Sequence, residues 1–170
     1  NKFMNAAGGA DVTQSFLSAY PEMDGIIVGG CTQYCLPGVV QAVKNSGRDI
    51  KVAGIDYDEN ILQHMEDGTV VGFTGGNWND DVLAACLIIN AIQGNRLCEE
   101  RVNLTTGYFV VDDLEKCQMF MDVWNNGNCM IYTEEQMKDM IVSNNPDFTL
   151  EKLLEINDSY SLEYILENRK

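Results

Sequence analysis

Three strand-and-helix units follow one another between residues 24 and 78, and this repetition constrains the fold more than any other feature. Apolar runs at residues 24–30, 51–56 and 70–76 each end in glycines or in a carboxylate. Helical spacing follows the first run until Gly47, and a shorter helix at residues 60–66 stops before Gly68. Parallel strands need such helical crossovers. The repetition therefore predicts an α/β fold with a parallel sheet.

The loops that follow these three strands are the predicted binding region. They cover residues 29–34, 56–59 and 74–78. In parallel sheets, ligands bind outside the carboxyl ends of the strands, where such loops converge. A single Asp after a strand, such as Asp56, serves equally well as a helix cap or a turn residue. The three loops together make the stronger prediction.

Four segments with a characteristic order and spacing lie within roughly residues 10–111: residues 19–28 (AYPEMDGIIV), 38–47 (GVVQAVKNSG), 51–56 (KVAGID) and 67–71 (DGTVV). In these segments the chain resembles the type I periplasmic binding proteins, in particular the sugar receptors of ABC transporters. The resemblance implies a flavodoxin-like lobe with a three-layer α/β/α parallel sheet. It also implies an extracytoplasmic receptor, in the periplasm or as a cell-surface lipoprotein, that closes two lobes on a sugar or polyol and presents it to a transporter permease.

The resemblance also assigns polar site residues. Asp56 matches a carboxylate that accepts hydrogen bonds from sugar hydroxyls, for which a charged acceptor with two oxygens is well suited. Thr32 and Gln33 stand where the family commonly has Asn-Asp, and Asn77 lies within one residue of a hinge amide. Asn5 stands where an Asp-Arg pair is usual, so a bidentate donor is lost. These departures leave a nucleoside-like ligand open beside a carbohydrate.

Aromatic residues accompany the polar ones, namely Tyr34, Tyr57 and Trp78. Sugar sites combine polar groups with flat aromatic faces, because a pyranose presents C–H groups on one side and hydroxyls at its rim. The alternative is that these rings pack against neighbouring loops. We expect Trp78, at the presumed hinge, to be the first of the three to touch a ligand.

Two segments are expected along the chain. Residues 1–111 form the ligand-binding lobe, in which residues 79–111 would pack on a second lobe, so the chain is expected to be part of a longer protein. The helix at residues 82–92 is apolar on nearly every face and needs a partner surface, either that lobe or a second copy of the chain. Residues 112–170 form an acidic helical extension with predicted caps at Thr133, Thr149 and Ser161.

Charge and motifs exclude several function classes. The net charge of −15 disfavours nucleic acid and anionic membranes as partners. Cys31 and Cys35 lack a second Cys or His pair, so no metal site is expected. Among the six cysteines, Cys117 and Cys129 are the one pair that flanks a turn in a way that could close a disulfide, and free thiols are the alternative. The only histidine, His64, lies on an exposed-looking helix, and we find no catalytic set and no cofactor motif.

The remaining alternative is the effector or sensor domain of a regulator or receptor with the same fold. An upstream DNA-binding or transmembrane helix would favour that function, whereas a secretory or lipoprotein signal would favour the solute receptor.

Overall fold

The computed structural model describes residues 4–127 and 130–168, and they form two compact units. The first, called the sheet unit here, comprises the chain up to residue 75 together with residues 110–118. The second, called the helical unit, comprises residues 76–109 and the chain from residue 119 onward. The boundary between these units differs from the expected boundary after residue 111, because residues 76–109 belong to the same unit as most of the C-terminal segment.

The sheet has four strands: β1 (Gly25–Val28), β2 (Lys51–Ile55), β3 (Val70–Gly75) and β4 (Phe109–Val111). Their order across the sheet is the order along the chain. Strands β1 and β2 pair in parallel, with Val28 opposite Gly54, and β2 pairs in parallel with β3. The predicted α/β fold with successive strand-and-helix units is confirmed.

Three helices accompany these strands: α1 (Ala6–Ala19), α2 (Thr32–Ser46) and α3 (Ile61–Glu66). Helix α1 begins at Ala6 because the Asn5 carboxamide oxygen accepts a hydrogen bond of 2.8 Å from the Gly8 N–H and caps the first turn. Helix α2 ends where Gly47 adopts a left-handed backbone, as its position predicts.

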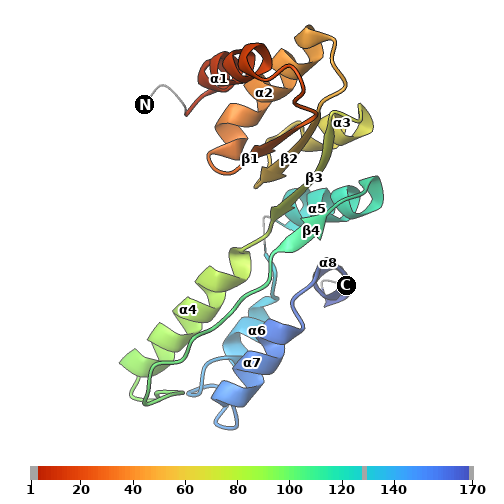
Figure 1. Cartoon of the computed structure of the whole chain (residues 1–170). Helices are drawn as coiled ribbons and strands as arrows, with labels where there is room; N and C mark the ends of the chain where they lie inside the picture. Colours follow the sequence, from red (N-terminus) through yellow and green to blue (C-terminus); the bar gives the residue numbers. More distant parts are fainter. Residues whose placement is uncertain (1–3, 128–129, 169–170) are drawn as a thin grey trace. The chain divides into compact units, whose positions relative to one another are not determined.

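Helices α1 and α2 lie side by side with their backbones in direct approach (Figure 1). A Cβ atom added to Gly38 would come within 1.7 Å of the Ala6 carbonyl oxygen, and one added to Gly9 within 2.4 Å of the Cys35 carbonyl oxygen. Only glycine fits at these two positions. The contact fixes α2, and therefore the loop that precedes it, against α1.

The two faces of the sheet differ in burial. Val28, Val52 and Phe73 point to one face by their alternation and register, and all three are buried. Ile27 and Ile55 point to the other face and are 79% and 45% exposed. The described helices thus cover one face of the strands, and the opposite face carries exposed apolar side chains.

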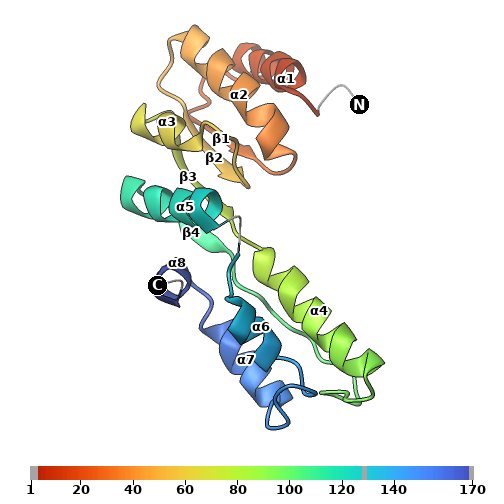
Figure 2. The ribbon, with the colours of Figure 1, turned by 180° about the vertical axis from the view of Figure 1, so that it is seen from behind.

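The helical unit is built from α4 (Trp78–Ile92), the later part of α5 (Leu114–Gly127), α6 (Glu134–Asp139), α7 (Leu150–Asp158) and α8 (Leu162–Asn168). Figure 2 shows α6 and α7 beside each other in this unit. All three predicted caps are confirmed, since the side chains of Thr133, Thr149 and Ser161 accept hydrogen bonds from backbone N–H groups three residues ahead. The acidic extension is therefore folded into regular helices.

The apolar helix α4 is only partly covered. Leu83, Cys86 and Asn90 are buried, whereas Ile88 and Ile92 are 58% and 81% exposed. Contacts with the C-terminal segment supply the buried side. The expected partner for the exposed side stays a prediction.

Buried polar groups join α4 to the C-terminal segment. The Asn90 amide donates to the Met140 carbonyl at 2.9 Å and accepts from the Val142 N–H at 2.7 Å. Asn79 accepts from the Tyr132 hydroxyl at 2.7 Å and donates to Asn157. A buried hydrogen bond is satisfied only when its donor and acceptor are correctly placed, so these bonds favour a single arrangement of α4 against the C-terminal segment.

Candidate functional site

The carboxyl end of β2 carries the central residue of the predicted site. Asp56 follows β2 directly and has a left-handed backbone with φ of 67°. Its N–H donates a 2.6 Å hydrogen bond to the carbonyl of Thr74 in β3, and this bond holds the turn in place. The Asp56 side chain is exposed and makes no hydrogen bond within the part of the chain that is described. The carboxylate is therefore free to bind a ligand.

A second left-handed residue lies at the end of the neighbouring strand. Cys31 follows Gly29 and Gly30 after β1, has φ of 53°, and occupies the N-cap position of α2. Cys31 and Asp56 are the two non-glycine residues with positive φ in the described ranges. Backbone strain of this kind concentrates at functional sites. Cysteine has no marked preference for this conformation, so nothing in the sequence marks Cys31 as a site residue.

Thr32 lies in the predicted binding region, but its side chain points into the protein interior. Its side chain is fully buried, and its hydroxyl donates to the carbonyl of Ile55 and lies 3.4 Å from that of Val28. These two carbonyls are at the ends of β2 and β1. Thr32 therefore ties the two strand ends together, so it positions the loops rather than offering its hydroxyl to a ligand.

The other predicted residues of the sheet unit differ in availability. Gln33 and Tyr34 are exposed in the first turn of α2, and Tyr34 is 52% exposed. Tyr57, next to Asp56, packs with its ring centroid 5.8 Å from that of Phe73. Asn5 uses its side chain to cap α1. Of the polar residues predicted for this edge, Asp56 and Gln33 are thus exposed and take no part in capping, and Tyr57 and Tyr34 are their neighbours in the sequence.

Asn77 and Trp78 belong to the helical unit. Asn77 is exposed at the N-cap position of α4, where its side chain makes no capping bond. The Trp78 ring stacks on Phe120 at 5.3 Å and on Trp124 at 5.8 Å between centroids. For Trp78, the structure therefore shows the alternative, in which the ring packs against neighbouring side chains.

A buried acid–histidine pair lies just beyond Asp56. The Asp58 side chain is 1% exposed and approaches His64 Nε2 at 3.2 Å. The expectation that His64 is exposed is wrong, since its side chain is only 12% exposed and α3 turns it inward. Asp58 Oδ1 and His64 Nδ1 are buried without a hydrogen-bond partner among the described residues. The pair anchors the start of α3 and with it the Asp56 loop.

The described cysteines are free thiols, namely Cys31, Cys35, Cys86, Cys98 and Cys117. Burial raises the pKa of the Cys86 thiol, and it raises that of Cys35 with a further contribution from Cys31. Burial, reinforced by Glu66, raises the pKa of Cys117 to about 11. These three thiols stay protonated at neutral pH and are poor nucleophiles. The predicted bridge to Cys117 involves Cys129, which lies outside the described residues.

Among the residues that the structure describes, no group of three His, Cys, Asp or Glu side chains could hold a metal ion. Within residues 4–127 and 130–168, none of the helices combines the length and apolar character needed to cross a membrane.

Comparison with known proteins leaves the family open. A scan against protein-family models and a search of curated proteins both ended without a significant match.

Proposed function

We propose that this chain is the solute-binding component of an ABC transporter and binds a small carbohydrate or polyol at the carboxyl ends of β1, β2 and β3. It acts as an extracytoplasmic receptor, in the periplasm or at the cell surface, and it is not an enzyme. Binding shifts the population of a hinged protein toward a closed form that the permease recognises.

The observation that carries this proposal is the pair of left-handed residues, Cys31 and Asp56, at adjacent strand ends. The folded chain maintains an unfavourable backbone at both positions, and at one of them it presents a carboxylate without a protein partner. Strand ends of a parallel sheet are where such folds bind ligands. The fixed loops around Thr32 and Asp58 support a site whose geometry is set before the ligand arrives.

The chemistry of this edge suits hydroxyl groups. The two oxygens of Asp56 accept hydrogen bonds from neighbouring hydroxyls, and charged acceptors form the stronger bonds. The Gln33 amide adds a donor and an acceptor. Tyr34 and Tyr57 offer flat faces for the C–H side of a sugar ring.

The exposed apolar surfaces support the larger architecture. Ile27 and Ile55 on the open face of the sheet would be covered in a three-layer α/β/α arrangement, and Ile88 and Ile92 of α4 would be covered by a second lobe or a second copy. In the two-lobed form, the ligand is enclosed between lobes and desolvated, which strengthens each polar contact.

Binding is tested by a thermal-shift screen against ribose, galactose, glucose and myo-inositol, with adenosine and leucine as other classes. A ligand that binds only the folded state raises the midpoint by mass action. For the sugar that shifts the midpoint, Asp56→Ala should weaken affinity by at least ten-fold, since it removes charged hydrogen bonds worth about 1.5–3 kcal/mol.

Asp49→Ala is the matched control. Asp49 precedes β2, at the end of that strand opposite to Asp56, and its exposed carboxylate pairs with Lys51 at 2.8 Å. This variant should bind sugar as the parent does. A shift with adenosine alone would discard the carbohydrate, and equal affinity in both variants would remove Asp56 from the site.

A further inference from the structure

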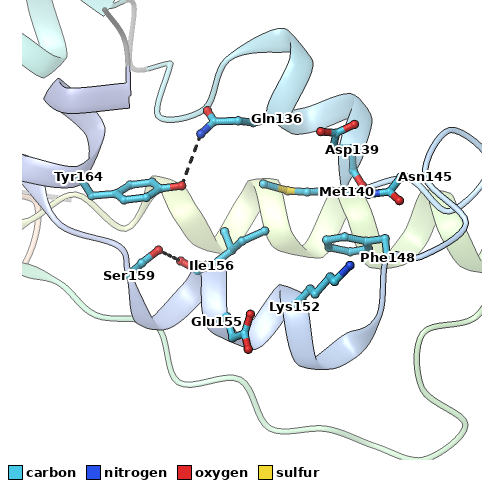
Figure 3. A pocket seen from close by; sticks show the side chains of 10 residues that line it. All are labelled: Gln136, Asp139, Met140, Asn145, Phe148, Lys152, Glu155, Ile156, Ser159 and Tyr164. Carbon is cyan, nitrogen blue, oxygen red and sulfur yellow. Dashed lines mark hydrogen bonds between the residues drawn. The ribbon is translucent and has the colours of Figure 1, made fainter.

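The helical unit contains a pocket of about 430 Å³, between α6, α7 and the start of α8. Figure 3 shows the side chains that line it. The volume lies toward the lower end of the range of about 300–1,000 Å³ typical of small-molecule sites. All the lining residues come from residues 136–164, so the pocket is separate from the proposed carbohydrate site in the sheet unit.

The floor of this pocket is apolar. Met140 and Phe148 are buried, at 1% and 6% exposure, and Ile156 of α7 lies beside them. Figure 3 shows Ile156 and Met140 facing the same space, with the Phe148 ring at one end. A floor of thioether, aromatic and branched aliphatic groups can accommodate an apolar side chain of moderate size, and burial of that side chain makes the free energy of binding more favourable.

The rim of the pocket carries charged side chains of both signs that form no ion pair within the described part of the chain. Lys152 lies in the first turn of α7, and Asp139 is the last residue of α6. Neither forms an ion pair with any residue that the structure describes, although other lysines of the chain do. A carboxylate beside Lys152 would also lie near the positive end of the α7 dipole. Glu155 adds a second carboxylate to the rim.

Two hydroxyl groups complete the lining. The Tyr164 hydroxyl accepts a 3.4 Å hydrogen bond from the Gln136 amide, which leaves its proton available to a ligand. The Ser159 hydroxyl donates to the Ile156 carbonyl at 2.9 Å, which leaves its lone pairs available. The pocket thus offers one cation, carboxylates, a donor and an acceptor above an apolar floor.

We propose that this pocket binds a free apolar amino acid in its zwitterionic form. The side chain lies on Met140, Phe148 and Ile156, the carboxylate pairs with Lys152, and the ammonium pairs with Asp139. A ligand with both charges and an apolar side chain satisfies the two unpaired rim groups and the floor together. A ligand with one charge leaves one of them unpaired.

The first test is titration calorimetry of the whole chain with L-phenylalanine and two analogues. Hydrocinnamate lacks the ammonium group, and phenethylamine lacks the carboxylate. Each analogue should bind at least ten-fold more weakly than phenylalanine. No binding by L-phenylalanine, L-leucine or L-methionine would overturn the proposal, as would equal binding by either analogue.

Variants locate the site. Lys152→Met keeps the aliphatic stem and removes the charge, and Asp139→Asn keeps the shape; each should weaken phenylalanine binding at least ten-fold. Lys138→Met is the matched control, because Lys138 is a neighbour of Asp139 that pairs with Glu134 at 2.6 Å and does not line the pocket. It should bind as the parent does.

Unchanged affinity in Lys152→Met, with folding verified by circular dichroism, would refute the assignment. The carbohydrate proposal is judged separately, since sugar binding depends on Asp56 and should be the same in Lys152→Met as in the parent.

Discussion

Replacing Asn90 of α4 by alanine should destabilise the helical unit far more than replacing an exposed asparagine of the same unit. The side chain is fully buried and uses both its donor and its acceptor on the backbone of residues 140 and 142. Alanine leaves the Met140 carbonyl and the Val142 N–H without partners and opens a small cavity. Each unpaired buried group costs about 1–3 kcal/mol, so we expect a loss of about 3 kcal/mol.

Tryptophan fluorescence isolates this effect. The chain has 2 tryptophans, and Trp78 and Trp124 both belong to the helical unit. Urea unfolding followed by fluorescence therefore reports that unit, while far-ultraviolet circular dichroism reports helices of both units. With a urea dependence of about 1–3 kcal/mol per molar, the fluorescence midpoint should fall by about 1 M or more.

Asn144→Ala is the control, because Asn144 is exposed and donates a single bond of 3.1 Å to the Lys138 carbonyl. Its effect should stay within about 0.5 kcal/mol. If Asn90→Ala and Asn144→Ala unfold at the same urea concentration, Asn90 does not join α4 to the C-terminal segment in solution, and the reasoning fails.

Three further predictions concern the sheet unit. Gly38→Ala should lower the free energy of unfolding, measured by circular dichroism, by about 2 kcal/mol or more, because the clash with the Ala6 carbonyl outweighs the better helix propensity of alanine. Gly29→Ala is the control, since a Cβ at Gly29 meets open space, and it should change the free energy of unfolding little. Burial raises the pKa of Cys117 to about 11 from the ordinary 9.0. Because the unfolded thiol ionises first, the free energy of unfolding should fall as the pH rises from 9 to 11, by at most about 1.4 kcal/mol per pH unit. Urea titrations across this pH range should show a shallower fall for Cys117→Ala. Iodoacetamide followed by peptide mass spectrometry should modify exposed Cys31 well before buried Cys35, and equal rates would contradict the described burial.

The local elements were predictable because their signals are local. Apolar periodicity with Gly47 and Gly68 delimited α2 and α3, and Thr133 with Gln136 marked the start of α6 through a capping box. The edge of the sheet that carries Asp56 followed from the parallel topology.

The contacts between distant segments were not predictable from these patterns. Asn79 and Asn90 read as polar interruptions in an apolar helix, and their partners are as far as 78 residues away in the sequence. The resemblance implies that Thr32 contacts the ligand, whereas in the structure its hydroxyl donates to the Ile55 carbonyl and lies 3.4 Å from the Val28 carbonyl. The left-handed backbone at Cys31 is imposed by tertiary structure and has no sequence signal.

The glycine contact between α1 and α2 bears on how stiff the candidate site is. Most helix pairs meet through side chains, which change rotamer and let the helices slide by small amounts. Here Gly38 and Gly9 bring backbone directly against backbone, and backbone atoms have no rotamers to change. Helices α1 and α2 therefore behave as one rigid body, so the first turn of α2, with Gln33 and Tyr34, cannot shift toward a ligand unless α1 moves with it.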